Sequence, residues 1–254
     1  MVFLHVSKPR GLPLPARKNP QTLRLIAANL SYQNGKAGEV SDILIRTDFD
    51  LAVLTEWTGK NALRDRLQKA GYVIALDYPM EGTHGLCVLA KTDLKIESDM
   101  VPTPIMSLCR MPFAVSRFLF HGVYITFIGA HTPPPVSACH DANRPTLKAM
   151  AAWIENGRLK SDLGPGRKGD PVLIAGDLNE YHPSRSLARF STVGMTDAFQ
   201  CGWKPQPTWA PMGVPSLIKI DHILMGKGFT ATGAYVIDMN GSDHRSVVAD
   251  LEER

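Results

Sequence analysis

Short apolar segments, each followed at once by a polar side chain, recur along this chain of 254 residues. Segments that are apolar throughout predict strands buried on both faces of a sheet. Ligands of α/β proteins bind beyond the ends of such strands, so the pattern predicts one cavity lined by oxygen and imidazole groups. The polar residues at these strand ends are Asn29, Glu56, His131, Asp177 with Asn179, Asp221, and Asp243 with His244.

Helical patterns interleave with the strands only part of the time. We expect strands over 23–29, 51–56, 72–76, 85–91, 113–120, 123–130, 172–175, 219–225 and 245–251. We expect helices over 36–47, 60–70, 143–156 and 183–190. Gly71 is placed to end the second helix, and His121-Gly122 predicts a tight hairpin turn. Hairpins mixed with βα units predict an α/β (α+β) fold in which two mixed β-sheets pack together with helices outside.

The chain contains no internal repeat and no compositional break between residues 23 and 254, which predicts one domain. Residues 1–22 are rich in proline and basic side chains and predict an extended arm. This arm, like the basic loop at 158–168, either contacts a polyanion or is solvated surface.

Composition favours a globular protein, with 44% hydrophobic and 20% charged residues, and the net charge of +4 is compatible with a polyanionic substrate. No apolar run approaches the roughly 18 residues of a membrane span. The 4 cysteines form no metal-binding spacing. We therefore expect reduced thiols in a monomeric, cytoplasmic protein without a membrane partner.

The first three polar residues are weak signals when each is taken alone. Asn29 can be a turn residue, and His131, before a proline-rich loop, can be a buried structural histidine. Glu56 follows a fully apolar strand, where a carboxylate is costly to desolvate unless it is paired or bound to a metal.

The later motifs are more informative. In Gly176-Asp177-Leu178-Asn179, a carboxylate and an amide directly follow a strand, and the alternative is an Asx turn that caps the helix at 183–190. Asp243-His244 joins a carboxylate to an imidazole before the last strand, and the alternative is a hairpin turn. Asp221 opens the preceding strand and can orient an imidazole.

Taken together and in order, these residues resemble the endonuclease/exonuclease/phosphatase superfamily over residues 23–251. The motifs are Asn29, Glu56 in LTEW, GLCVLAK at 85–91, His131 in GAHT, GDLN at 176–179, Thr208-Trp209, IDHIL at 220–224 and SDHRSV at 242–247. The resemblance implies a DNase I-like, four-layer sandwich and a catalytic domain that hydrolyses phosphoric esters.

The resemblance also implies a role for each residue. Glu56 would be the main ligand of Mg²⁺, or of Mn²⁺, with Asn29 and Asp243 near the ion. Asp177 would align the attacking water, Asn179 would orient the water or the phosphate, and His244 paired with Asp221 would contact a phosphate oxygen. His131 would contact the phosphate or protonate the leaving group. Trp209 would bind substrate together with Asn179. Oxygen ligands suit Mg²⁺ or Mn²⁺ better than zinc.

The substrate is less constrained than the reaction. We expect a nuclease acting on DNA or RNA. The alternatives are a phosphatase or phospholipase-type phosphodiesterase acting on small phosphorylated molecules or lipid headgroups, and a non-enzymatic binding module. The segment 209–221 is short and contains one lysine, which does not favour tight binding of a duplex.

Overall fold

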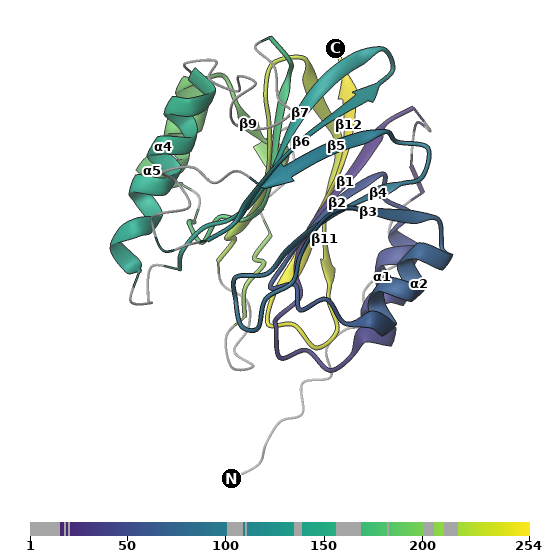
Figure 1. Ribbon diagram of the computed structural model, residues 1–254. Coiled ribbons are helices and arrows are strands. Elements are labelled where there is room, and N and C mark those ends of the chain that lie inside the picture. The colour runs from purple at the N-terminus through teal and green to yellow at the C-terminus, as the bar shows by residue number, and fades with distance from the viewer. Residues whose placement is uncertain are drawn as a thin grey trace.

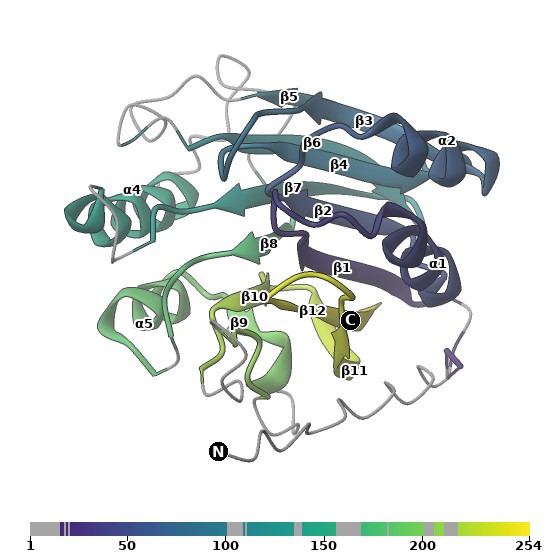
Figure 2. The same ribbon diagram turned by 90° about the horizontal axis from the view of Figure 1, so that it is seen from below.

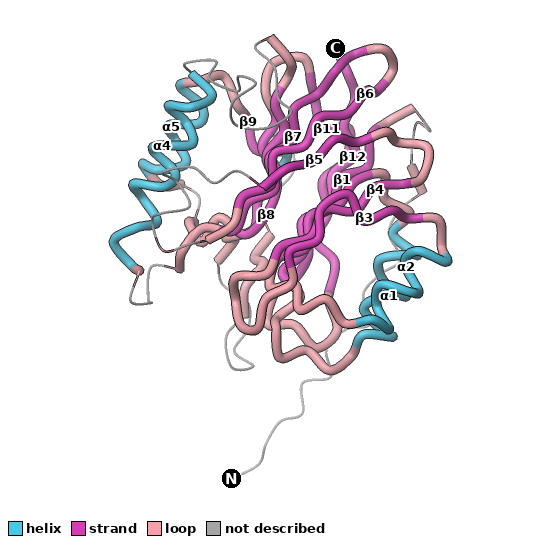
Figure 3. The backbone as a smooth tube through the Cα atoms, in the orientation of Figure 1, coloured by secondary structure: helices cyan, strands magenta, loops and turns pink. Residues whose placement is uncertain are grey.

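The computed structural model describes residues 16–17, 19, 21–100, 109, 111–134, 139–155, 169–181, 183–200, 206–210 and 218–254. Within these residues, two 6-stranded sheets pack face to face between two pairs of helices, as Figure 1 shows. Figure 3 shows the same arrangement, with both sheets between the helical layers. The predicted four-layer sandwich is confirmed.

The first sheet contains, in spatial order, β11 (Phe229–Asp238), β12 (Arg245–Glu253), β1 (Leu23–Asn29), β2 (Leu51–Thr55), β4 (Leu86–Lys91) and β3 (Tyr72–Tyr78). The second contains β5 (Ile96–Met100), β6 (Phe113–Phe120), β7 (Val123–His131), β8 (Val172–Asp177), β10 (Asp221–Met225) and β9 (Thr196–Asp197). In each sheet the third and fourth strands run parallel, β1 with β2 and β7 with β8, and the other neighbours are antiparallel. Both sheets are therefore mixed, as predicted.

Helices α1 (Ala37–Thr47) and α2 (Asn61–Lys69) lie on the outer face of the first sheet, and α4 (Asn143–Glu155) and α5 (Arg185–Thr192) lie on that of the second, as Figure 2 shows from below. Two short 3₁₀ turns, η1 (His140–Ala142) and η3 (Ala198–Gln200), complete the described elements. None of the described helices is long and apolar enough to cross a membrane.

Three apolar clusters hold the four layers together. The largest lies between the sheets and includes Leu25 of β1 and Phe127 of β7. A second joins the first sheet to its helices through residues such as Leu44, and a third joins the second sheet to its helices through residues such as Leu147. Because both faces of each sheet are covered, the central strands β1, β2 and β8 are buried along their whole length and are mostly apolar.

Two local predictions are confirmed. His121 (φ 47°) and Gly122 (φ 87°) form the turn between β6 and β7, whose last pair is Phe120 with Val123. Positive φ at both central residues is the geometry that fits the twist of a two-residue hairpin. Gly71 follows the end of α2 with φ 87°, a conformation that glycine adopts without the steric cost of a Cβ.

The described part of the N-terminal arm is attached to the end of the first sheet that lies away from Asn29. Arg17 Nη1 donates to Asp50 Oδ2 over 2.6 Å, and Asn19 Nδ2 donates to Glu252 Oε1 over 3.0 Å. Asp50 precedes β2 and Glu252 is near the end of β12, whereas Asn29 ends β1. The described arm residues are thus held by the domain and lie away from the predicted cavity. The rest of the arm and the loop at 158–168 are outside the described residues.

The expectation of reduced cysteines is wrong for one pair. Cys109 and Cys139 form a disulfide across a sequence separation of 30, with Cα atoms 5.9 Å apart. The sequence conceals this pair because the two segments meet only in the folded chain. Cys87 is a free, buried thiol, as predicted, and Cys201 lies outside the described residues. Disulfides persist in oxidising compartments, so cysteine usage no longer supports a cytoplasmic location.

Candidate active site

The sheet topology brings the predicted polar residues to one edge of the sandwich. Asn29 ends β1, Glu56 follows β2, and His131 and Asp177 end the parallel strands β7 and β8. Asp221 begins β10 directly opposite Asp177. His244 precedes β12, which runs antiparallel to β1. The carboxyl ends of four strands thus meet the starting ends of two antiparallel strands.

Two positions in the motifs must be glycine, because the backbone of a neighbouring segment passes too close to leave room for a side chain. A Cβ on Gly176 would lie 1.8 Å from the carbonyl oxygen of Ala130 on the neighbouring strand, and φ at Gly176 is 144°. A Cβ on Gly85 would lie 1.8 Å from the carbonyl oxygen of Trp57. Any side chain at these positions would force the strands that carry the site apart.

Glu56 and Asn179 both adopt left-handed backbone conformations, with φ 53° and 47°. Such conformations cost about 1–3 kcal/mol in a residue other than glycine and persist only where the surrounding structure enforces them. The structure around Glu56 and Asn179 therefore holds both residues in conformations that they would not adopt freely.

Asn29 links the two carboxylates that face it. Its Nδ2 donates to Glu56 Oε1 over 3.1 Å and to Asp177 Oδ2 over 3.0 Å. Its Oδ1 accepts from the backbone N–H of Ser31 over 2.9 Å, and Glu56 Oε2 accepts from the backbone N–H of Tyr32 over 2.9 Å. In this arrangement Asn29 presents its amide group, not its oxygen, to Glu56 and Asp177.

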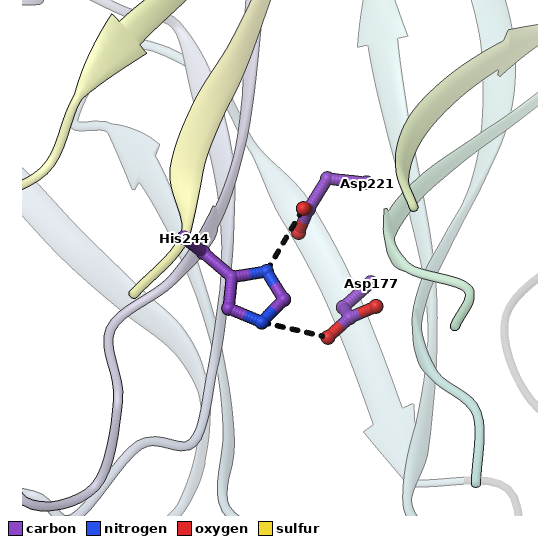
Figure 4. A group of neighbouring side chains, drawn as sticks. All are labelled: Asp177, Asp221 and His244. Carbon is purple, nitrogen blue, oxygen red and sulfur yellow. Dashed lines mark hydrogen bonds and ion pairs between the residues drawn. The ribbon is translucent and has the colours of Figure 1, made fainter. Parts of the chain in front are cut away.

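The His244 ring lies between two carboxylates, as Figure 4 shows. Its Nδ1 is 2.9 Å from Asp221 Oδ2, and its Nε2 is 3.7 Å from Asp177 Oδ2. Ser242 ties this loop to β1, because its hydroxyl donates to the Asn29 carbonyl over 2.8 Å and accepts from the His244 N–H over 3.0 Å. Asp243 and His244 lie in the connection of the hairpin formed by β11 and β12, as the structural alternative predicted, and within it Asp221 orients the ring while Ser242 holds the backbone.

The charges around His244 favour its protonated form. Burial opposes a charge on the ring and lowers its pKa, but the carboxylates of Asp221 and Asp177 outweigh burial and raise the pKa of His244 to about 10. Burial likewise raises the pKa of Asp221, while the adjacent imidazolium favours its carboxylate form. The two effects together favour an imidazolium on His244 beside the carboxylate of Asp221.

His131 is buried beside the same carboxylate. Its Nε2 is 3.5 Å from Asp177 Oδ2. Its Nδ1 is buried and has no hydrogen-bond partner among the described residues. A buried ring nitrogen without a partner is uncommon, so the observation does not fit the structural alternative in which all its polar atoms are satisfied.

The GDLN turn is fixed by backbone contacts. The backbone N–H of Asn179 donates to Asp177 Oδ1 over 2.9 Å, and Asn179 Nδ2 donates to the Thr132 carbonyl over 2.8 Å. The turn has Asx geometry, but it does not cap the following helix. Ser184 does so, by accepting from the backbone N–H of Leu187. The side chain of Asp177 is consequently committed to the site.

Asp243, which was predicted to lie near the ion, contacts a tryptophan next to the site. Its side chain is exposed, and its Oδ2 accepts from Trp209 Nε1 over 3.2 Å. Within the described ranges no hydrogen bond or ion pair joins Asp243 to Glu56. Trp209 forms an isolated β-bridge with His244, so the pair lies at the rim of the site.

The donor groups are suitable for a divalent cation. Atoms of Asp177, Asp221 and His244 lie within 4.8 Å of one another. A protonated ring has no lone pair for a cation, so the candidate ligands here are the carboxylates, including that of Glu56, which adjoins Asp177 through Asn29. The carboxylates of Asp177, Asp221 and Glu56 give this edge an excess of negative charge over the imidazolium of His244. Carboxylate oxygens are the ligands that Mg²⁺ and Mn²⁺ prefer.

Sequence reasoning missed two groups of residues that build the site. Asn143, at the start of α4, donates through Nδ2 to the carbonyl of Leu178 over 3.0 Å and so supports the GDLN turn. The second group is Asp197, Lys219 and His222, which lie behind the site. Lys219 and His222 interrupt the apolar pattern of the strand around Asp221, and that interruption was the available signal.

A two-sheet sandwich with this edge defines a class of hydrolases that act on phosphoric ester bonds. The chain belongs to the Endonuclease/Exonuclease/phosphatase family, whose model matches residues 18–244. The prediction made from the motifs is confirmed at that level.

Solved structures share the fold. A humanized TDP2 from D. rerio is 15% identical, with a TM-score of 0.71, covering 91% of this chain and 99% of that chain. The D. rerio TDP2 complexed with single strand DNA product is 16% identical with a TM-score of 0.70, and covers 91% and 99%. A mannosyl-6-phosphatase from Bacteroides thetaiotaomicron is 18% identical with a TM-score of 0.65, and covers 91% and 99%. No curated protein matches the sequence.

Proposed function

We propose that this protein is a Mg²⁺-dependent phosphodiester hydrolase, and specifically a nuclease that cleaves DNA or RNA by in-line attack of water. Mn²⁺ would substitute for Mg²⁺. The observation that carries the proposal is the imidazolium of His244, held by Asp221 on one side and facing Asp177 on the other. A phosphodiester repels an incoming nucleophile through its own negative charge, and a fixed imidazolium next to a carboxylate supplies both a positive charge and a proton acceptor.

The roles follow from the contacts. His244 Nε2–H would donate to a non-bridging phosphate oxygen, since Nδ1–H is occupied by Asp221. Asp177 would align the attacking water through its carboxylate, which is held in place because Oδ1 accepts from the Asn179 N–H and Oδ2 from Asn29 Nδ2. His131, with an unpartnered Nδ1 among the described residues, would contact the phosphate or protonate the leaving oxygen.

Glu56 is the residue we assign to the metal, with Asn29 holding it against Asp177. A bound divalent cation would neutralise the developing charge and stabilise the leaving oxygen. Asp243 with Trp209 would act at the rim, toward the ion or the substrate.

Two observations support nucleic acid as the substrate. The solved complex of D. rerio TDP2 holds a single strand DNA product. Tyr32, whose backbone contacts Glu56, and Tyr181, which follows the GDLN turn, have exposed side chains, at 38% and 52%. Exposed aromatic rings beside a phosphate site can stack on bases.

A phosphatase acting on small phosphorylated molecules is the second candidate. It is favoured by the similarity to a mannosyl-6-phosphatase, which covers the same share of this chain, 91%, as the similarity to the TDP2 structures. A binding module without activity is disfavoured because Glu56, Asp177 and His244 are all present. Asn29 links Glu56 to Asp177, and His244 lies beside Asp177.

A substrate panel tests the proposal. The purified protein is incubated with supercoiled plasmid, a single-stranded oligonucleotide, bis(4-nitrophenyl) phosphate and 4-nitrophenyl phosphate, in Mg²⁺, Mn²⁺, Ca²⁺ or EDTA. We expect cleavage of the nucleic acids and of the diester in Mg²⁺ and Mn²⁺, and none in EDTA. Asp177→Asn and His244→Ala should abolish it, while Asp170→Asn, which breaks an ion pair with Arg117 on β6, should not.

Intact nucleic acid in every metal, together with rapid release of 4-nitrophenol from the monoester, would replace the nuclease by the phosphatase. Activity that persists in EDTA would refute the metal assignment.

A further inference from the structure

A buried cluster of three ionisable side chains lies behind the site, on the α5 side of the second sheet. Lys219 Nζ is 2.7 Å from Asp197 Oδ2 and 2.8 Å from His222 Nδ1, and His222 Nδ1 is 2.7 Å from the same Asp197 oxygen. The exposed fractions of Asp197, Lys219 and His222 are 5%, 6% and 0%. We call Asp197, Lys219 and His222 the buried cluster.

The far nitrogen of His222 reaches the GDLN turn. His222 Nε2 is 2.9 Å from the backbone carbonyl oxygen of Glu180, the residue after Asn179. A carbonyl can only accept, so Nε2 carries the proton. On the other side of the ring, Nδ1 lies within hydrogen-bond distance of both the Lys219 ammonium and the Asp197 carboxylate, which are paired with each other. The cluster therefore fixes the orientation of the ring.

Strand β10 couples the cluster to the site, because successive side chains of a strand point to opposite faces. Asp221 faces the inner side and holds His244, whereas His222 faces α5 and holds Glu180. The turn between Asp177 and Glu180 is thus held at one end by its strand and at the other by His222.

The cluster is not explained by stability alone. Burying an ammonium and a carboxylate carries a desolvation cost that often exceeds their mutual attraction, and apolar replacements of such pairs are often neutral or stabilising. Burial lowers the pKa of Lys219, which shows this cost on the ammonium, whereas on Asp197 the effect of burial is outweighed by Lys219 and His222, which lower the pKa of its carboxyl group. The directed contact of the cluster to the Glu180 carbonyl of the GDLN turn points to positioning.

We propose that Asp197, Lys219 and His222 are positioning residues, which hold the Glu180 carbonyl and thereby the left-handed Asn179 and the carboxylate of Asp177 in their reactive arrangement. The proposal rests on the proposed function for its effect on rate, but its structural part does not depend on that function. Misplacing a catalytic group by as little as 1 Å can cost on the order of 100-fold in rate.

The test compares three variants. The triple variant Asp197→Leu/Lys219→Met/His222→Leu removes the cluster without leaving a buried charge. His222→Gln keeps an N–H that can donate to Glu180. Arg24→Met/Asp250→Leu is the matched control, since Arg24 and Asp250 form a similarly buried ion pair, 2.6 Å apart, on β1 and β12 at the end away from the site.

Each variant is measured for kcat and KM on bis(4-nitrophenyl) phosphate in Mg²⁺, for Tm, and for hydrogen exchange of the Asn179 amide. The Asn179 N–H donates to Asp177 Oδ1, so its exchange rate reports the turn directly. We expect the triple variant to lose at least about tenfold in kcat with KM within about twofold, and to exchange Asn179 at least about tenfold faster while Tm is unchanged or raised. His222→Gln should retain most of the wild-type kcat and most of the protection of the Asn179 amide. The control variant should have the wild-type kcat and the wild-type exchange rate.

A folded triple variant with wild-type kcat and wild-type exchange at Asn179 would overturn the proposal, as would equal losses in the control. If the wild-type protein does not hydrolyse the diester, the proposed function fails, while the exchange rate of Asn179 still decides whether the cluster holds the turn. If the triple variant does not fold, the exchange rates of His222→Gln and of His222→Asn, whose shorter amide does not span the distance to Glu180, decide it in the same way: equal rates refute the proposal.

Discussion

Replacing Asp221 by asparagine should convert His244 from a permanently charged group into one that titrates near neutrality. In the wild-type protein the two carboxylates raise the pKa of His244 from 6.5 to about 10 against the effect of burial. Asp221 is the larger of the two raising influences, and its oxygen is 2.9 Å from the ring whereas that of Asp177 is 3.7 Å away. The substituted amide would keep a hydrogen bond to the ring but not the negative charge.

The size of the effect follows from the titration. If the pKa of His244 returns to its ordinary value, only about one-tenth of the molecules carry an imidazolium at pH 7.5. The rate on a diester substrate should therefore fall about tenfold at pH 7.5 for this reason, and by less at pH 5.5. The assay is kcat/KM against pH for wild type and Asp221→Asn, together with the imidazole chemical shifts of His244. A loss of activity that is the same at pH 5.5 and pH 8.5 would refute the electrostatic role of Asp221.

The same shift has a consequence for stability. The folded-state pKa of His244 is above its unfolded value, so the folded protein binds the proton more tightly. The stability that this pair contributes is then fully present below the unfolded pKa of 6.5 and is lost as the pH rises toward about 10. In Asp221→Asn the free energy of unfolding should depend less on pH across this window, as urea titrations at several pH values would show.

Three further changes have outcomes set by the fold. Gly176→Ala should lower the free energy of unfolding by more than about 3 kcal/mol in urea titration, because its Cβ would lie 1.8 Å from the Ala130 carbonyl; a loss below about 1 kcal/mol, the effect of an ordinary substitution, would contradict this. Cys109→Ser with Cys139→Ser should lower it by on the order of 3–4 kcal/mol, since the bridge spans 30 residues, and an unchanged Tm in the absence of reductant would show that the bridge does not form. Ser184→Ala should cost about 1 kcal/mol through loss of the α5 cap, with Ser184→Asp as the conservative control that keeps the cap.

The sequence predicted the central strands and their polar ends because those strands are buried on both faces and carry a continuous apolar signal. It missed β5, β9 and β11 for identifiable reasons. The sequence IESDM of β5 is polar, as suits a strand at the edge of its sheet, and β9 contains two residues. In β11 the register shifts between Ala231 and Gly233, which interrupts the alternation that marks a strand.

The sequence predicted which residues would form the site better than it predicted the hydrogen bonds between them. Motif order identified Asn29, Asp177, Asp221 and His244, and the structure brings their side chains into contact. The direction of the Asn29 amide could not be read from the sequence, because it depends on where the Ser31 N–H and two carboxylates lie after folding. Any residue can supply a backbone carbonyl, so contacts such as those to Glu180 and Leu178 could not be predicted from the residue type of the acceptor.

The order of strands in the first sheet determines when the site can exist during synthesis. β12 follows every other described strand in the chain, yet it lies between β11 and β1, and His244 directly precedes it. The first sheet therefore stays divided, with β1 lacking one of its two neighbours, until this segment has left the ribosome. Because the same segment delivers the imidazole, a nascent chain that already contains Glu56 and Asp177 lacks the His244 ring of the site until this segment has been synthesised.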